Sequence, residues 1–232
     1  MAAHAVNPLK TGEYVSEGGM GRLSITDGGQ SGLRFEIHTI GPNRHSCDLG
    51  GNIAGNIGRA TSDGFPSCVV VFEEDATAIQ VRVGDQAKDN FENCRNYCGM
   101  RAGFDGTYWT LPPDCGGTEK RRTLGRYASL YQAGQYAAAL QVLRSFQASC
   151  EKFLDVTSEL DRVHNDVAIT LHHLGDDKAC LQELAKTMAA SADSEEDLRQ
   201  GMAGEPANFE LYLPVAKSTW FNQKLCKGRD AK

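Results

Sequence analysis

Eight cysteines are the residues of this sequence best suited to chemistry. They are spread along the whole chain, at Cys47, Cys68, Cys94, Cys98, Cys115, Cys150, Cys180 and Cys226. An even count distributed in this way is typical of disulfide pairing in an oxidising compartment. A zinc site and buried free thiols are the alternatives, but Cys94 and Cys98 have no second close ligand pair at zinc-finger spacing. The pattern favours disulfides in an exported protein.

Position along the chain ranks the disulfide pairings but does not fix them. Cys47 and Cys68 flank a predicted hairpin, so we expect these two to pair. Cys180 and Cys226 come next, because they would tie a C-terminal helix to the helices before it. The remaining four cysteines stay unordered.

Three histidines fall on one predicted helix, at His164, His172 and His173. Two side chains on a helix share a metal ion when they are three or four residues apart. His164 and His172 are eight residues apart, which is too far for one small ion. We therefore predict no metal site.

Other catalytic patterns are weak. The acidic run Glu73–Asp75 has the residue type of a glycosidase, but no second carboxylate can be placed opposite it, and a solvated turn explains it better. Cys94 or Cys98 would need a histidine partner and an unpaired thiol to act as a nucleophile. The sequence also lacks the common hydrolase, phosphate-loop and dinucleotide motifs. We expect a protein that is not an enzyme and uses no cofactor.

The elements that position these residues change character along the chain. Residues 12–110 contain short alternating apolar and polar segments, such as Gly21–Thr26, Leu33–Ile40 and Ala78–Val83. Similar glycine- and aromatic-rich segments open and close this half, at Gly12–Tyr14 and Phe104–Trp109. They favour a sheet that closes on itself. We predict an antiparallel β-barrel, with a two-sheet sandwich as the alternative.

The proline- and glycine-rich segment Leu111–Gly117 predicts a domain boundary. Residues 118–226 then have helical periodicity, and the predicted helices are Thr118–Ala133, Gln135–Ser149, Ser158–Leu174, Asp177–Ala190 and Asn208–Leu225. The pattern of Leu130–Leu140 resembles a tetratricopeptide (TPR) helix-turn-helix. The fold class is therefore α+β, with a C-terminal TPR-like helical domain.

Two loops of the β half lack an obvious packing role, and loops on a rigid scaffold commonly carry binding residues. They are Ser16–Gly21 and Gly41–Ser46. We predict that Glu17, Met20, Asn43, Arg44 and His45 contact a partner. Plain connection of strands is the alternative for each loop.

Charge narrows the class of partner. The net charge is −6, which disfavours nucleic acid, because phosphate binding needs a basic surface. Residues 1–115 carry 9 Lys+Arg and 14 Asp+Glu, so most of the acidity lies in the β half, where a basic protein would bind by preference.

No run of about 18 apolar residues is present, so we expect no transmembrane segment. Residues 1–8 do not form an intact signal peptide, and a mature start with an added methionine is our interpretation.

Several segments resemble uncharacterised periplasmic proteins of proteobacteria, and they are Gly18–Ile25, His45–Leu49, Cys94–Tyr108 and Asn165–Gly175. That group is loosely similar to LprI-type lysozyme inhibitors. The resemblance implies a periplasmic location and an inhibitory or protective role, and it assigns no inhibitory residue.

Three function classes follow from these observations. The first is a periplasmic inhibitor that covers the active site of a peptidoglycan hydrolase, either a lysozyme or a secreted antibacterial effector for which the chain is the immunity protein. The second is an envelope adaptor or structural protein that binds a peptide or protein through the TPR-like half. The third is an unrecognised peptidoglycan hydrolase.

Overall fold

The computed structural model describes residues 9–85, 89–156 and 158–230. The chain divides into two compact units, Met1–Leu111 and Pro112–Lys232, which are called here the barrel unit and the helical unit. The division falls within the proline- and glycine-rich segment 111–117. The expected mature start at residues 1–8 lies outside the described residues.

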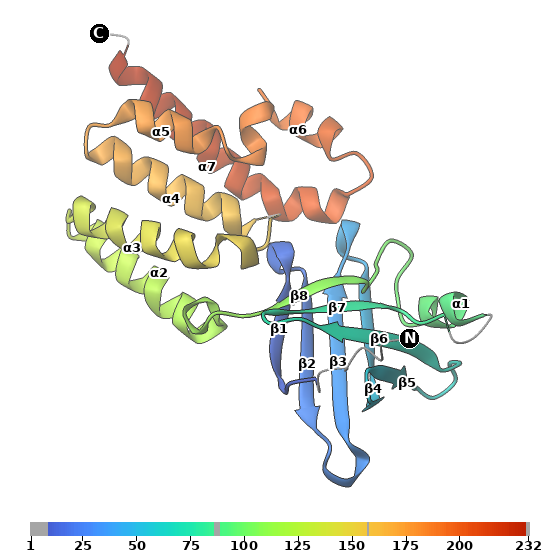
Figure 1. Ribbon diagram of the computed structural model, residues 1–232. Coiled ribbons are helices and arrows are strands. Elements are labelled where there is room, and N and C mark those ends of the chain that lie inside the picture. The colour runs from blue at the N-terminus through green and yellow to red at the C-terminus, as the bar shows by residue number, and fades with distance from the viewer. Residues whose placement is uncertain (1–8, 86–88, 157, 231–232) are drawn as a thin grey trace, which may run out of the picture. The chain divides into compact units, whose positions relative to one another are not determined.

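The barrel unit is a closed barrel of eight antiparallel strands (Figure 1). Each strand pairs with its neighbours in sequence, and the last strand pairs with the first, so that Tyr14 lies between Leu23 and Thr110. The strands are β1 (Gly12–Ser16), β2 (Gly21–Asp27), β3 (Leu33–Ile40), β4 (Ser46–Ala54), β5 (Ile57–Ala60), β6 (Cys68–Glu74), β7 (Ala78–Val83) and β8 (Gly106–Thr110). The α+β fold class with an N-terminal barrel is confirmed, and the sandwich alternative is wrong.

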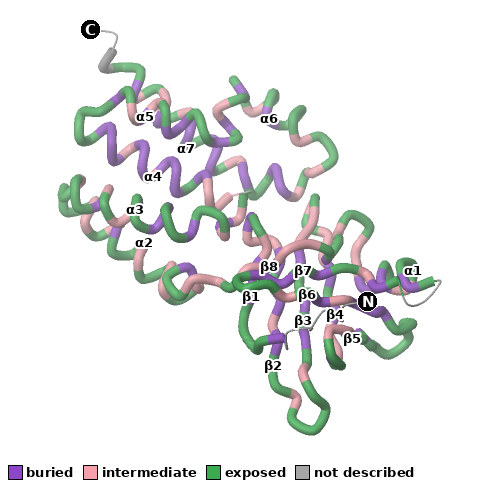
Figure 2. Tube along the Cα trace, in the orientation of Figure 1, coloured by how far each residue is buried: buried purple, intermediate pink, exposed green. Residues whose placement is uncertain are grey.

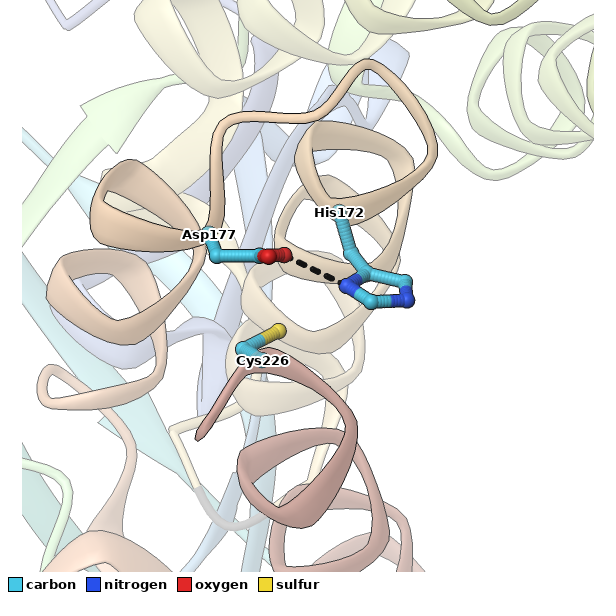
Figure 3. A group of neighbouring side chains, drawn as sticks. All are labelled: His172, Asp177 and Cys226. Carbon is cyan, nitrogen blue, oxygen red and sulfur yellow. Dashed lines mark hydrogen bonds and ion pairs between the residues drawn. The ribbon is translucent and has the colours of Figure 1, made fainter. Parts of the chain in front are cut away.

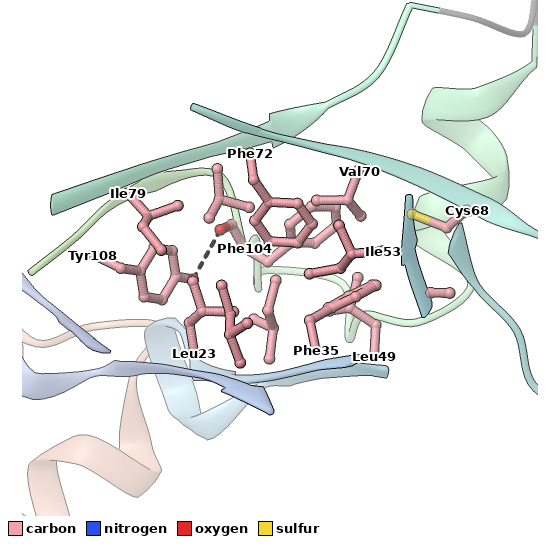
Figure 4. Close-up of a cluster of buried hydrophobic side chains, with 14 of the residues drawn as sticks. Leu23, Phe35, Leu49, Ile53, Cys68, Val70, Phe72, Ile79, Phe104 and Tyr108 are labelled. Carbon is pink, nitrogen blue, oxygen red and sulfur yellow. Dashed lines mark hydrogen bonds between the residues drawn. The ribbon is translucent and has the colours of Figure 1, made fainter. Parts of the chain in front are cut away.

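Alternation along the strands fills the barrel interior with side chains. On β3, Phe35, Ile37 and Thr39 are buried, while the residues between them are exposed. Figure 2 shows buried positions along the strands, and Figure 4 shows the apolar side chains packed between the walls. The rings of Phe35 and Phe72 meet edge to face with centroids 5.1 Å apart. A barrel of eight strands has an interior just wide enough to be filled in this way.

Glycine is required on β5 where the rings of Phe35 and Phe72 pack against the strand. A Cβ atom at Gly58 would lie 2.7 Å from the rings of both Phe35 and Phe72. Such a distance is far inside van der Waals contact, so any larger residue would displace these rings. The aromatic pair in the core therefore explains why β5 has a glycine at this position.

Four disulfides staple the chain, and they use all eight cysteines. The predicted Cys180–Cys226 bond is confirmed. The predicted Cys47–Cys68 bond is wrong. These two cysteines open β4 and β6, which are separated by β5, and the long connection between β7 and β8 supplies a partner for each. The pairs are Cys47–Cys98, Cys68–Cys94, Cys115–Cys150 and Cys180–Cys226. Such bonds are consistent with an oxidising compartment.

The helical unit consists of packed helices, which are α2 (Gly117–Gln132), α3 (Tyr136–Cys150), α4 (Glu159–His173), α5 (Asp177–Leu184), α6 (Glu195–Gly201) and α7 (Pro206–Asp230). In Figure 1, α2 and α3 form one hairpin and α4 and α5 form a second. Gly134 and Gly175 follow α2 and α4 with φ of 71° and 85°, the left-handed geometry that ends a helix. The TPR-like character of these hairpins stays a prediction.

One predicted helix boundary is wrong, and two helices are additional to those predicted. The helix expected at Asp177–Ala190 ends at Leu184, where the Thr187 hydroxyl donates a 2.8 Å hydrogen bond to the Leu184 carbonyl. A short 3₁₀ helix, Met188–Ser191, follows. Two short helices were not predicted, α6 and α1 (Asn90–Arg95), the latter in the barrel unit. Among the described helices, none has the length and apolar character needed to cross a bilayer.

Candidate functional site

One end of the barrel carries the two loops that the sequence singles out. Because all strands are antiparallel and sequential, every second connection lies at the same end. The connections at residues 17–20, 41–45, 61–67 and 84–105 therefore share one end. We call these four connections the braced end. It includes Glu17, Met20, Asn43, Arg44 and His45.

The longest of these connections, residues 84–105, is fixed to the barrel by two disulfides and a buried asparagine. Cys94 bonds Cys68 at the start of β6, and Cys98 bonds Cys47 at the start of β4. Asn90 is 1% exposed and its side chain makes three hydrogen bonds of 2.7–2.8 Å. Their partners are the Val69 amide and carbonyl and the Gly84 carbonyl. Residues 90–98 of this connection are thereby fastened to β4 and β6 of the barrel.

Tyr97 joins the same connection to the loop at residues 61–67. Its single O–H is shared between the carbonyls of Ala60 and Pro66, at 3.2 and 3.1 Å. Its ring lies against Phe65, with centroids 5.8 Å apart. Burial raises the pKa of Tyr97 above 10.0, so the hydroxyl stays a donor at neutral pH. The 61–67 loop is thereby held against a stapled segment.

Glu17 and Met20 lie beside a shallow hollow of about 330 Å³, which is also lined by Thr39 and Trp109. The Ile40 amide donates a 2.8 Å hydrogen bond to the Met20 carbonyl, which joins the first connection to the end of β3. Glu17 is exposed and Met20 is half-buried. Both side chains are therefore within reach of a molecule that covers the braced end.

Asn43, Arg44 and His45 form a tight loop in an unusual backbone conformation. Asn43 and Arg44 have φ of 53° and 64°, the left-handed region that residues other than glycine seldom adopt. The loop closes on itself through the 2.7 Å hydrogen bond from the Gly41 amide to the His45 carbonyl. It also packs on residues 84–105, because a Cβ atom at Gly99 would lie 3.0 Å from His45 Nδ1. Strained backbone held by its surroundings is common at functional sites.

Exposed hydrophobic side chains add a feature that the sequence analysis missed. Within the described part of the barrel unit, three large hydrophobic side chains are strongly exposed, Phe65 (50%), Phe91 (59%) and Met100 (80%). All three lie at the braced end, and Phe91 borders a hollow of about 240 Å³. Exposed aromatic and methionine side chains at one end of a scaffold are of the residue types enriched at protein interfaces. In the sequence, these three side chains are recognisable only as apolar residues within segments whose composition is otherwise typical of loops.

The braced end is mildly acidic. By sequence, its four connections contain six carboxylates and four cationic side chains. Arg44 and Arg101 are among the cations, so the surface is mixed and not a uniform negative patch. A positively charged protein would gain a modest increase in association rate here.

The acidic run Glu73–Asp75 has structural roles at the opposite end. Glu73 pairs with Arg82, and Glu74 accepts a 3.0 Å hydrogen bond from the Lys10 amide. Asp75 accepts from the amides of Thr77 and Ala78, and these bonds lower its pKa below 3.8. The run thus closes a turn between β6 and β7.

Two of the three helical histidines form separate pairs with carboxylates. His164 Nδ1 lies 2.7 Å from Glu183 Oε1, and His172 Nδ1 lies 2.6 Å from Asp177 Oδ1. Both pairs are buried. His173 instead stacks on the Tyr136 ring, with centroids 4.4 Å apart. The three histidines therefore do not converge on a single point.

The helical unit also has a groove of about 760 Å³ between α2, α4 and α7. Tyr127 and Tyr131 of α2 line it together with Asp166 of α4 and Phe221 of α7. Phe221 is 61% exposed. Burial raises the pKa of Asp166 to about 6, and the nearby Arg162 offsets only part of that effect. The groove offers aromatic surface beside a carboxylate that titrates near neutral pH.

Comparison with known proteins gives no match, whether to a protein-family model, a curated protein or a solved structure.

Proposed function

We propose that this protein is a periplasmic inhibitor that binds a peptidoglycan hydrolase with the braced end and covers its active site. The partner is a lysozyme or a secreted antibacterial effector, and in the second case the chain is the effector's immunity protein. The single observation that carries the proposal is the exposure of Phe65, Phe91 and Met100 on the connections of one disulfide-braced end of the barrel. Aromatic residues and methionine are enriched at protein interfaces.

The covalent and hydrogen-bond fastening of the described part of the braced end supports tight binding. A surface that is already ordered loses little conformational entropy when it binds, so more of the contact energy appears as affinity. The two disulfides and the Asn90 hydrogen bonds hold the connection that presents Phe91 and Met100. An inhibitor needs high affinity because it competes with the substrate for the active site of the hydrolase.

Compartment and charge fit the same partner. Four disulfides are consistent with the oxidising periplasm, where peptidoglycan hydrolases act. Many lysozymes are basic, and the net charge of −6 favours encounter with a basic protein. A small-molecule carrier is less well supported, because side chains fill the barrel interior.

The test is inhibition by the oxidised full-length protein of a panel of purified lysozymes and secreted muramidases. We expect stoichiometric inhibition of at least one enzyme. Phe91→Ser and Met100→Ser should each weaken it by about tenfold or more, as expected for central interface residues. Phe221→Ser, an equally exposed aromatic of the helical unit, is the matched control and should inhibit like the wild type.

A panel that shows no inhibition, or equal loss with Phe221→Ser, contradicts the proposal. Release of soluble peptidoglycan fragments by the protein alone would instead support the hydrolase class.

A second candidate function is an envelope adaptor that binds a peptide through the helical unit. The groove between α2, α4 and α7 favours it, because exposed Phe221 and the ring of Tyr131 offer apolar contacts beside the polar Asp166. Pull-down from envelope extracts with the wild type, Phe221→Ser and Phe91→Ser separates the two candidates. Loss of a captured protein with Phe221→Ser alone would favour the adaptor.

A further inference from the structure

The disulfide between α5 and α7 lies beside a buried histidine–carboxylate pair. His172 is in the last turn of α4, Asp177 is the first residue of α5, and Cys226 lies near the end of α7 (Figure 3). Cys226 is bonded to Cys180, which follows Asp177 by three residues on α5. Residues three apart on a helix lie on the same face. Three side chains of metal-ligand type therefore meet where three helices come together, and Cys180 is bonded to one of them.

Distances at this cluster are close to those of a metal site. One potential ligand atom each from His172, Asp177 and Cys226 lies within 4.8 Å of the other two. In Figure 3 the Asp177 carboxylate and Cys226 Sγ both lie on the Nδ1 side of the imidazole. Tetrahedral Zn²⁺ with nitrogen, oxygen and sulfur ligands holds those atoms roughly 3.3–3.8 Å apart, as its bond lengths of about 2.0–2.3 Å require. A movement of about 1 Å or less brings the three groups to that geometry.

The cluster is shielded from water. Cys180 and Cys226 are fully buried, and His172 and Asp177 are 9% and 6% exposed. A buried site excludes competing water ligands, and a set of two sulfurs, one nitrogen and one oxygen suits zinc better than magnesium or calcium, which require oxygen ligands.

We propose that Cys180, Cys226, His172 and Asp177 form a Zn²⁺ site when the Cys180–Cys226 disulfide is reduced. A dithiol donor supplies two electrons and two protons, so that it becomes a disulfide and the two cysteines become thiols. Zn²⁺ then displaces the two thiol protons and binds both thiolates. Nδ1 of His172 and a carboxylate oxygen of Asp177, which face each other in the oxidised protein, complete the tetrahedron.

The two states fasten the same helices. In the oxidised protein the disulfide joins α5 to α7, and in the reduced protein the metal would join α4, α5 and α7. The C-terminal helix is thus held by the disulfide when the cysteines are oxidised, and by the metal before oxidation or under reducing conditions. This inference is independent of the hydrolase-inhibitor proposal, because it involves none of the residues of the braced end.

Cobalt titration of the reduced full-length protein tests the site. The protein is reduced anaerobically with a phosphine, and Co²⁺ is added as a spectroscopic substitute for Zn²⁺. We expect one equivalent of Co²⁺ with the visible bands of tetrahedral coordination and a near-ultraviolet thiolate-to-cobalt band, both abolished by one equivalent of Zn²⁺. Asp177→Asn and His172→Gln should each weaken binding by at least about tenfold.

A matched control is needed because reduction frees all eight cysteines. The double variant Cys180→Ser/Cys226→Ser should lose the tetrahedral spectrum. Cys115→Ser/Cys150→Ser, which removes the other disulfide of the helical unit, should keep it. If reduction melts the helices, Zn²⁺ should restore the helical circular dichroism signal in the wild type and the control but not in Cys180→Ser/Cys226→Ser.

Three results would overturn the proposal. They are no tetrahedral spectrum in the reduced wild type, equal Co²⁺ binding by Cys180→Ser/Cys226→Ser, and unchanged affinity in both Asp177→Asn and His172→Gln.

Discussion

His164 Nδ1 and Glu183 Oε1 lie 2.7 Å apart in the interior of the helical unit, with both side chains 3% exposed. Gln147, Arg144 and Lys186 also donate hydrogen bonds to this carboxylate. Burial alone would raise the pKa of Glu183, but these donors outweigh it and hold the pKa well below 4.5. The carboxylate therefore stays charged and joins α3, α4 and α5.

Glu183→Gln should lower the free energy of unfolding at pH 7 by about 2–3 kcal/mol, because it removes a charge on which three donors and a histidine depend. A depressed native pKa means that the unfolded chain binds the proton more readily, so the stabilisation is present above about pH 4.5 and is lost as the pH falls. Urea titrations from pH 7 to pH 3 should show the two proteins converging in stability. A constant difference across this range would contradict this role.

Asp166→Asn should have the opposite effect, because the pKa of Asp166 is raised from 3.8 to about 6. Above pH 6 the half-buried charge costs the wild type stability, and this cost disappears as the pH falls toward 4. At pH 7 the variant should be more stable by on the order of 1–3 kcal/mol, less any loss of attraction to Arg162. The difference should shrink between pH 6 and pH 4 in thermal melts. A less stable variant at pH 7 would mean that Arg162 dominates.

Removal of the Cys68–Cys94 disulfide should lower stability by about 3–4 kcal/mol, the entropy expected for a loop of this length. The Cys115–Cys150 bond closes a loop of similar length and should cost a similar amount. The two double serine variants should differ in inhibition of the partner hydrolase, since only the first releases the connection that presents Phe91 and Met100. Denaturant titration and an inhibition assay on each variant provide the comparison. Equal inhibition by both would argue against rigidity as the source of affinity.

The Arg44→Gly variant tests whether the Arg44 side chain contributes to binding, separately from the strain of its backbone. Arg44 adopts a φ of 64°, and glycine occupies this region without steric cost. The gain in the folded state and the extra entropy of an unfolded glycine largely cancel, so stability should stay within about 1 kcal/mol of the wild type. Inhibition should still weaken, because the side chain lies at the braced end. Unchanged inhibition would remove Arg44 from the proposed interface.

Much of the fold is predictable from the periodicity of the sequence. The strand predicted at Leu33–Ile40 matches β3, because one face of the strand is buried and the other is exposed. Helices were located by their apolar spacing, and the glycines at 134 and 175 mark where two of them end. Local patterns determine such elements, so a single sequence is enough to find them.

Contacts between distant segments were harder to predict. The Cys47–Cys98 and Cys68–Cys94 bonds require residues 84–105 to return across the end of the barrel, and no local pattern encodes that path. The short helix α1 within that connection gave too little periodicity to be recognised. The exposure of Phe91 depends on the same path, so the apolar part of the candidate site was missed.

The cluster of His172, Asp177 and Cys226 illustrates the same limit. His164 and His172 are two turns apart on one helix and contact different carboxylates, so these two histidines do not share an ion. Cys226 comes from another helix and is distant in sequence but adjacent in space to His172. Spacing along a single helix therefore does not reveal this cluster.

An even number of strands decides where the chain enters and leaves the barrel. Gly12 opens β1 and Thr110 closes β8 at the rim opposite the braced end, as the pairing of Tyr14 with Thr110 shows. The connections of the braced end other than the disulfide-bonded residues 84–105 can therefore be lengthened, randomised or exchanged without moving either junction of the chain. The barrel is therefore suited to loop grafting, in which different binding loops are placed on one unchanged scaffold.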